Sequence, residues 1–169
     1  MRVISDPSAW FEDALADLDE DVVLVSPHFV HRFTERIAEA VAGSPRRWAV
    51  VTTIDPDAAA RDELSVDGLH LLFDAGVQIQ HVDRLRTHCL FVGRRALLGA
   101  ADVGTTALGA VHLREEPEET EDDGQLPMEL AVELTEDQLA EAWAQVSRRR
   151  SVVVDARDLD WLRAQVRGA

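Results

Sequence analysis

Two short, unbroken runs of mostly apolar, β-branched residues constrain the fold of this chain more than any other feature. The first is DVVLVS, which begins at Asp21, and the second is WAVVTTI, residues 48–54. Runs of this kind are typical of strands that are buried on both faces, as in parallel sheets. Between them, Phe29 to Ala42 has the apolar spacing of an amphipathic helix, and Gly43-Ser44-Pro45 ends it. The sequence therefore predicts an α/β fold.

The remaining segments extend this alternation. Helices are expected after Asp6-Pro7-Ser8, after Asp55-Pro56-Asp57 with an interruption near Ser65 to Gly68, after Thr135, and from Asp158 to Val166. Strands are expected at residues 77–82, 87–92, 95–100, 128–134 and 151–154. Gly93-Arg94 suits a two-residue hairpin turn. This order predicts a mixed sheet sandwiched between helices, in one domain that covers residues 1–169.

The charge is strongly acidic but unevenly distributed. The chain has 32 acidic and 17 basic side chains and a formal net charge of −15 at pH 7, which disfavours binding to nucleic acid and to membranes. Residues 115–123 (EEPEETEDD) are predicted to form a solvated loop insertion, or alternatively an arm for a basic protein partner. By contrast, the segment 84–101 contains no carboxylate and holds several cations. They are Arg84, Arg86, Arg94 and Arg95, with His88 between them.

Every basic residue counted above is Arg, since the sequence has no Lys. The acid surplus without Lys indicates either adaptation to a high-salt cytoplasm or a GC-rich genome, and stability in molar KCl would distinguish the two. The lone Cys89 excludes a disulfide framework and fits a reducing compartment. Early acids at Asp6, Glu12 and Asp13 interrupt any signal-peptide core. We therefore expect a cytoplasmic protein.

The hairpin segment carries residues that resemble a known catalytic motif. Residues 87–109 read THCLFVGRRALLGAADVGTTALG, which is similar to the phospholipase D superfamily signature, His-x-Lys-x4-Asp followed by Gly-Ser-x-Asn on the next strand. His88 matches the nucleophilic histidine, and Gly99-Ala100-Ala101-Asp102 matches Gly-Ser-x-Asn. The order of elements from Val3 to about Val146 resembles half of a superfamily protein. Two such motifs meet in that family, so the single copy here implies a homodimer.

The segment also departs from the motif. Leu90 stands at the Lys position, Arg95 stands at the Asp position, Ala100 replaces Ser and Asp102 replaces Asn. The hairpin is also shorter than the family's. Removing one donor that stabilises transition-state charge commonly costs ~10²–10³ in rate.

The resemblance and its departures together imply a degenerate, non-catalytic domain that acts as a binding, regulatory or scaffold subunit. Its phosphate-accepting residues would be Arg84, Arg86, Arg94 and Arg95, with Asp102 at a substituted motif position. The alternative is an active phosphodiesterase or nuclease, with His88 as nucleophile and an arginine in place of Lys. A core histidine is a further interpretation of His88.

Other motifs predict no cofactor and no metal. The i, i+3 pair His28 and His31 follows the first buried strand, at the sheet edge where ligands of α/β proteins gather, but it lacks a third ligand. Cys89 is expected to fill the core rather than react. The sequence contains no Walker loop, GxGxxG or GxSxG, so neither nucleotide hydrolysis nor serine-esterase chemistry is indicated.

Overall fold

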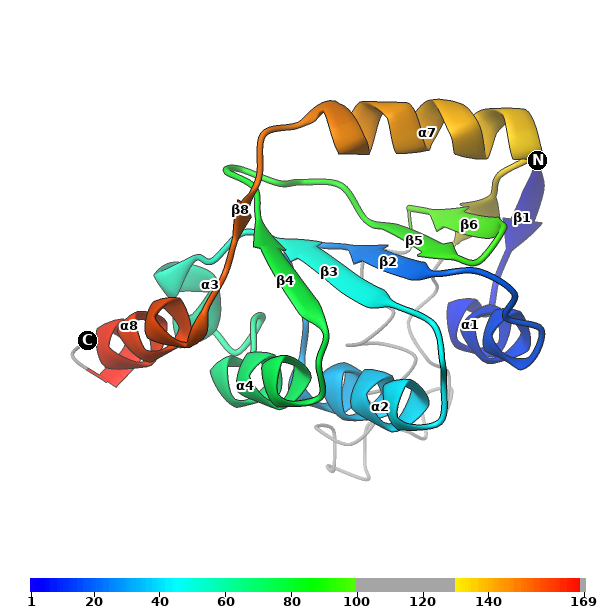
Figure 1. The fold of residues 1–169 in the computed structure, drawn as a ribbon. Helices are drawn as coiled ribbons and strands as arrows, with labels where there is room; N and C mark the ends of the chain where they lie inside the picture. Colours follow the sequence, from blue (N-terminus) through cyan, green and yellow to red (C-terminus); the bar gives the residue numbers. More distant parts are fainter. Residues whose placement is uncertain (100–129, 168–169) are drawn as a thin grey trace, which may run out of the picture.

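The computed structural model describes residues 1–99 and 130–167. In this part of the chain, eight strands form a single mixed sheet in the order β1-β7-β6-β5-β2-β3-β4-β8 (Figure 1). The strands are β1 (Arg2–Ile4), β2 (Val22–Val25), β3 (Trp48–Thr52), β4 (Gln78–His81), β5 (Cys89–Val92), β6 (Arg95–Leu98), β7 (Ala131–Glu133) and β8 (Val152–Val153). The expected mixed sheet between helices is confirmed.

Three neighbouring strands of the sheet are parallel. β2, β3 and β4 pair in parallel, so their carboxyl ends meet at one edge of the sheet. β5 runs antiparallel to β2 and places its first residue, Cys89, opposite the last residue of β2, Val25. The segment that leads into β5 therefore reaches the same edge as the segments that leave the parallel strands. Ligand sites of open α/β sheets gather at such edges.

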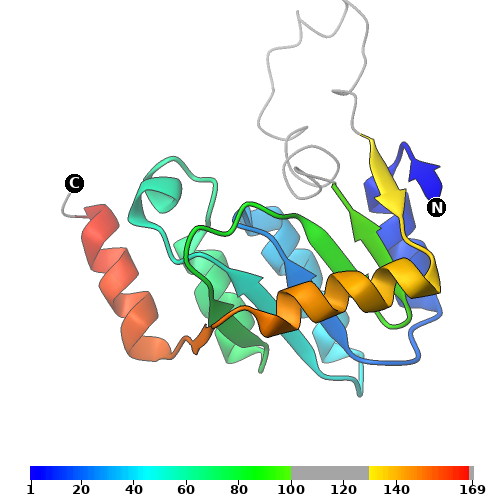
Figure 2. The ribbon, with the colours of Figure 1, turned by 90° about the horizontal axis from the view of Figure 1, so that it is seen from above.

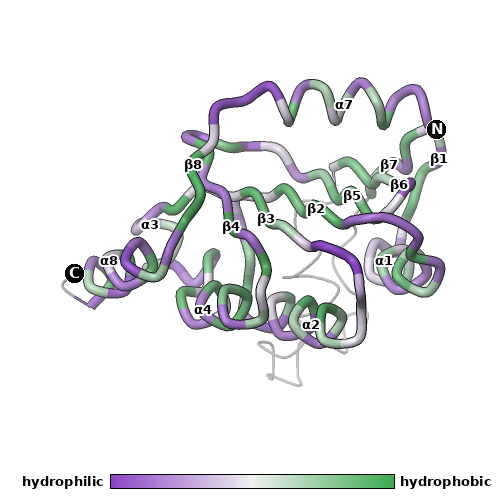
Figure 3. Tube along the Cα trace, viewed as in Figure 1, coloured by the Kyte–Doolittle hydropathy of each residue, from purple (hydrophilic) through white to green (hydrophobic). Residues whose placement is uncertain are grey.

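The helices cover the two faces of the sheet unequally. They are α1 (Pro7–Ala16), α2 (His31–Ala42), α3 (Pro56–Ala60), α4 (Val66–Asp74), α7 (Glu136–Arg148) and α8 (Ala156–Arg167). Figures 1 and 2 show α7 alone across one face, whereas α1, α2 and α4 pack on the other. The larger apolar core lies on the side of α1, α2 and α4, and a smaller cluster lies under α7. In Figure 3 the central strands are hydrophobic along their length, while α7 alternates between hydrophobic and hydrophilic residues.

Local sequence signals explain where most elements begin and end. Asp6 caps α1 by accepting a hydrogen bond from the Ala9 amide, and Thr135 forms a capping box with Gln138 at α7. The expected third helix is divided into α3 and α4, and Ser65 caps the second part. Gly93 has a φ of +63°, as the first position of a type II′ hairpin turn requires.

Two expectations need correction. The helix predicted from Phe29 begins at His31, because Phe29 instead forms a β-bridge with Leu64. The apolar spacing after Thr135 predicts that Trp143 lies on the buried face of its helix, but this side chain is 41% exposed. It meets Phe91 edge-on at a ring distance of 5.2 Å. A single helix over a small apolar cluster cannot enclose so large a side chain.

Several expectations fall on residues 100–129, outside the described part of the chain. They are the end of the strand predicted at 95–100, the start of the strand predicted at 128–134, the acidic segment 115–123, and Asp102. Among the described residues, no helix has the length and hydropathy needed to cross a bilayer.

Candidate functional site

His88 lies at the edge of the sheet where β2, β3 and β4 end. It immediately precedes β5, and its carbonyl accepts a hydrogen bond from the Gly99 amide at 2.9 Å. Its Nδ1 is 3.0 Å from the hydroxyl oxygen of Ser26, the residue that follows β2. Alternation along the strand places His88 on the same side of the sheet as Leu90, the side of α2 and α4. The structure therefore places the candidate nucleophile at the edge where the sequence predicts His28 and His31.

Ser26 links His88 to the backbone of the loop after β2. Its side chain is buried, and its hydroxyl oxygen accepts a hydrogen bond from the His28 amide at 3.0 Å and lies 2.9 Å from the His28 carbonyl oxygen. The hydroxyl has one proton to donate. If it donates to the His28 carbonyl, then Nδ1 of His88 must carry a proton and donate to Ser26. In that tautomer the lone pair of the imidazole is on Nε2.

A second imidazole stands beside the first. The ring centroids of His28 and His88 are 5.8 Å apart, and His28 Nε2 is 3.5 Å from a carboxylate oxygen of Glu63. A hydrogen bond from Arg61 lowers the pKa of Glu63, so this carboxylate stays ionised near its neighbour. Two imidazoles, one hydroxyl and one carboxylate thus gather at this edge.

The nearby His31 belongs to a separate set of contacts. Its Nδ1 is 3.2 Å from the Ser65 hydroxyl, and its Nε2 is 3.5 Å from Glu35. Within residues 1–99 and 130–167, no three His, Cys, Asp or Glu side chains converge where they could hold a metal ion. His28 and His31 are therefore not brought together as a metal site with a third ligand.

Leu90, at the Lys position of the motif, points into the core. It is 3% exposed and belongs to the large apolar cluster with Leu24, its partner in the β2–β5 register. No cation is presented from this position. Cys89 points to the opposite face, and burial raises the pKa of its thiol to about 12. The thiol is therefore protonated at neutral pH and is a poor nucleophile.

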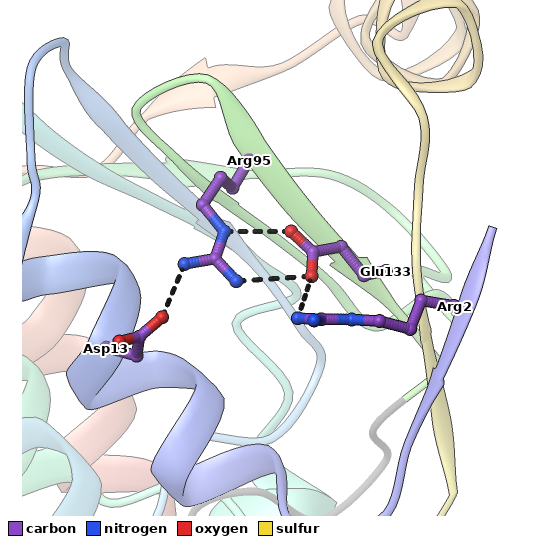
Figure 4. Close-up of polar contacts among 4 residues, drawn as sticks. All are labelled: Arg2, Asp13, Arg95 and Glu133. Carbon is purple, nitrogen blue, oxygen red and sulfur yellow. Dashed lines mark hydrogen bonds and ion pairs between the residues drawn. The ribbon is translucent and has the colours of Figure 1, made fainter.

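Arg95, at the Asp position of the motif, is held in a network of carboxylates. Its guanidinium donates to both carboxylate oxygens of Glu133, at 2.8 and 3.1 Å, and to Asp13 at 2.8 Å (Figure 4). Arg2 donates to the same Glu133 carboxylate at 2.6 Å. The hydrogen bonds from Arg95 lower the pKa of Glu133, while burial opposes them. Arg95 also lies 5.2 Å from the ring centroid of Trp10.

The four arginines of the hairpin segment separate into two groups. Arg94 pairs with Glu20 and Asp19, and Arg94 and Arg95 both lie at the turn of the hairpin. With a rise of about 3.3 Å per residue, the length of β5 separates them from His88 by roughly 15 Å. Arg84 and Arg86 instead precede His88, are exposed, and form no ion pair within the described part of the chain. The structure brings only the second group toward the carboxyl edge.

Solved structures with similar folds fit this arrangement. Nuc from Salmonella typhimurium, a phospholipase D family member, aligns with a TM-score of 0.62 at 11% identity, covering 92% of this chain and 97% of Nuc. Phosphatidylserine synthase from Haemophilus influenzae aligns with a TM-score of 0.58 at 15% identity, covering 90% of this chain and 39% of the synthase. This chain has a phospholipase D-like fold.

A third similar solved structure is TrmBL2, an archaeal chromatin protein with a novel mode of DNA binding. It aligns with a TM-score of 0.50 at 12% identity, over 85% of this chain and 49% of TrmBL2. The chain thus spans about half of TrmBL2 and less of the synthase. No protein-family model matches the sequence, and no curated protein matches it significantly. The resemblance stated from the hairpin is therefore confirmed at the level of the fold.

Sequence reasoning missed two partners at the carboxyl edge of the phospholipase D-like sheet. Ser26 contacts His88, and Glu63 contacts His28, although 62 and 35 positions separate the members of each pair in the sequence. A signal for Ser26 was present, because it is the polar residue that ends the run DVVLVS. Glu63 had no such signal, since it reaches the edge only through the turn between α3 and α4.

Proposed function

We propose that this chain is a phospholipase D-like domain without catalytic activity, which serves as a binding, regulatory or scaffold subunit. The observation that supports this most is the buried side chain of Leu90 where the motif has its lysine. Phosphoryl transfer depends on donors aimed at the charge on the phosphoryl oxygens. An apolar side chain in the core supplies none.

The other departures support the same proposal. Arg95 could compensate for the missing cation only if its guanidinium were available, but Glu133 and Asp13 engage it. Arg94 is engaged by Glu20. Arg84 and Arg86 remain as the cations with which a binding subunit would accept a phosphate or another anion. We place the protein in the cytoplasm, where a free, deeply buried Cys89 stays reduced.

We further propose that the domain is a homodimer, because it carries one copy of a motif that acts in pairs. Sedimentation velocity across a hundredfold range of protein concentration tests this. The chain has a mass of 18.7 kDa, and a species of twice this mass is expected at the higher concentrations. A monomer throughout that range would contradict the dimer without affecting the proposal of a binding subunit.

The second candidate is an active phosphodiesterase or nuclease, and the contact between Ser26 and His88 favours it. With Nδ1 protonated, Nε2 of His88 would attack phosphorus and form a phosphohistidine, while the P–O bond to the leaving alkoxide breaks and an acid of the second motif in the dimer protonates that oxygen. Water would then attack the phosphohistidine, return a proton to that group and release a phosphate monoester. DNA binding, as in TrmBL2, is a weaker candidate because a net charge of −15 repels a polyanion.

Turnover of bis-p-nitrophenyl phosphate and of plasmid DNA separates the candidates. The wild-type protein and the His88→Ala variant are assayed at equal concentration, and circular dichroism checks that both are folded. If the chain is a non-catalytic binding subunit, the wild-type protein turns over neither substrate faster than the His88→Ala variant does. Turnover that disappears in His88→Ala would overturn it and establish the phosphodiesterase.

A further inference from the structure

A groove lies between α7 and the sheet, on the face opposite to His88. It has a volume of about 400 Å³, within the range of small-molecule pockets. Its floor is apolar and comes from the ends of the central strands, with Val25, Val51 and Cys89. Ala142 and Val146 of α7 form its wall. The groove exists because one helix does not cover this face, which also leaves Trp143 partly exposed.

The rim of the groove is cationic. Arg84 and Arg86 approach from the segment between β4 and β5, and Arg149 approaches from the end of α7. Among residues 1–99 and 130–167, no carboxylate lines the groove. In a chain with a net charge of −15, three arginines around one apolar cavity are a marked local reversal of charge. Elsewhere in the described residues, several arginines pair with carboxylates, among them Arg36, Arg95 and Arg163, whereas others, such as Arg32, form no ion pair.

The segment that carries Arg84 is fixed before any ligand binds. The Thr53 hydroxyl donates to the Val82 carbonyl at 2.5 Å and accepts from the Leu85 amide at 3.0 Å. Arg149 donates to the Asp83 carbonyl at 3.1 Å, which ties α7 to the same segment. Arg84 itself has a φ of +55°, an uncommon conformation for a residue other than glycine. The neighbouring residues thus hold Arg84 in a strained backbone conformation that places its side chain at the groove. Because this segment is already ordered, less conformational entropy is lost when a ligand binds.

We infer that this groove binds a small amphiphilic organic anion, in which a phosphate or carboxylate is attached to a flat apolar body. The apolar floor would hold the body, and the arginine rim would hold the anionic group by charge-assisted hydrogen bonds. A purely apolar ligand would leave the cations unused, and a simple inorganic anion would leave the floor hydrated. The inference rests on the proposed role as a binding subunit and names the chemical class of the ligand.

Calorimetric titration with 1-naphthyl phosphate tests the inference. This probe has about 15 non-hydrogen atoms, so a dissociation constant of a millimolar or tighter is expected. Inorganic phosphate and 1-naphthol, which each supply one half of the probe, are expected to bind at least tenfold more weakly. Comparison with 1-naphthoic acid shows whether phosphate or carboxylate is preferred. Release of naphthol during the titration would count against the non-catalytic function but not against the groove.

Two variants and two matched controls locate the binding. Ala142→Leu fills the groove from α7, whereas Ala144→Leu makes the same change on an exposed position of the same helix. The double substitution Arg84→Gln/Arg86→Gln removes two rim cations, whereas Arg32→Gln/Arg157→Gln removes two exposed cations of α2 and α8. The first of each pair should weaken binding at least tenfold, and the controls should change it less than twofold. Unfolding temperatures within a few degrees of the wild type show that each variant is folded.

Three results would overturn the inference. They are no binding of either naphthyl anion at several millimolar, binding of 1-naphthol as tight as that of 1-naphthyl phosphate, and equal weakening by a variant and its control. The turnover assay on His88→Ala stays separate from all three. A failure of the groove and a failure of the proposed function are therefore distinguishable.

Discussion

Replacement of Arg95 by Met removes the centre of the ion-pair network shown in Figure 4. Met is similar in length and keeps contact with Trp10, but Glu133 loses two hydrogen bonds from the guanidinium. The Glu133 side chain is 16% exposed, so water cannot fully replace them. A hydrogen bond to a charged group contributes about 1.5–3 kcal/mol, and Arg2 still binds Glu133. We therefore expect a loss of about 2–3 kcal/mol in the free energy of unfolding.

The pH dependence of this loss follows from the pKa of Glu133. The hydrogen bonds from Arg95 lower that pKa in the folded state below its ordinary value of 4.5. The stabilisation is then complete above the unfolded pKa and disappears as pH falls through the lower folded pKa. The difference between wild type and Arg95→Met should accordingly be largest near pH 7 and should shrink below about pH 4.

Urea unfolding followed by circular dichroism measures both effects, and thermal unfolding should show a decrease of about 5–10 °C at pH 7. Arg94→Met is the matched control, since Arg94 is adjacent in sequence, and its pairs with Glu20 and Asp19 are exposed. It should leave the unfolding temperature unchanged. Equal effects of the two substitutions, or a difference that grows as pH falls, would refute the reasoning.

Three further predictions concern packing, the thiol and salt. Gly68→Ala places a methyl group against the Thr34 side chain where α4 meets α2, and should lower the free energy of unfolding by about 1–3 kcal/mol in urea titrations. Gly43→Ala should cost less than half as much, because a Cβ added there would meet open space. Cys89 should not react with a thiol reagent in the folded protein at pH 8, because the thiol is buried and burial raises its pKa to about 12. In urea it should react at once. Rapid labelling without denaturant would contradict its burial. If the acid surplus is salt adaptation, the unfolding temperature should be higher in molar KCl than at low salt, and equal values would remove that hypothesis.

Much of the fold could be predicted because its signals are local. The apolar runs that became β2 and β3, the cap residues Asp6 and Thr135, and the turn at Gly93 each depend on a few neighbouring residues. The carboxyl edge also followed from the pattern, since parallel strands separated by a helix end on the same side. The position of His88 at this edge was not predicted, because it depends on the antiparallel pairing of β5 with β2.

The contacts around the candidate site were different, because they join residues that are far apart in the sequence. Ser26 meets His88 only through the antiparallel pairing of β2 and β5. In the sequence, Arg95 has no acidic neighbour, but in the structure it forms an ion pair with Glu133 of β7. The pairing of β6 with β7 brings the two residues together. The composition of the segment 84–101 predicts a cationic hairpin. The sequence does not show, however, which of these cations form ion pairs with distant carboxylates.

The sequence by itself determined the alternation of strands and helices, the mixed sheet and the position of His28 at its carboxyl edge. Periodicity and capping encode these features within each segment. Only the tertiary structure decided that Leu90 faces the core, that Arg94 and Arg95 are occupied by carboxylates, and that Arg84, Arg86 and Arg149 surround an apolar groove. Those outcomes depend on which segments pack together, and long-range packing is a property of the whole chain rather than of any one segment.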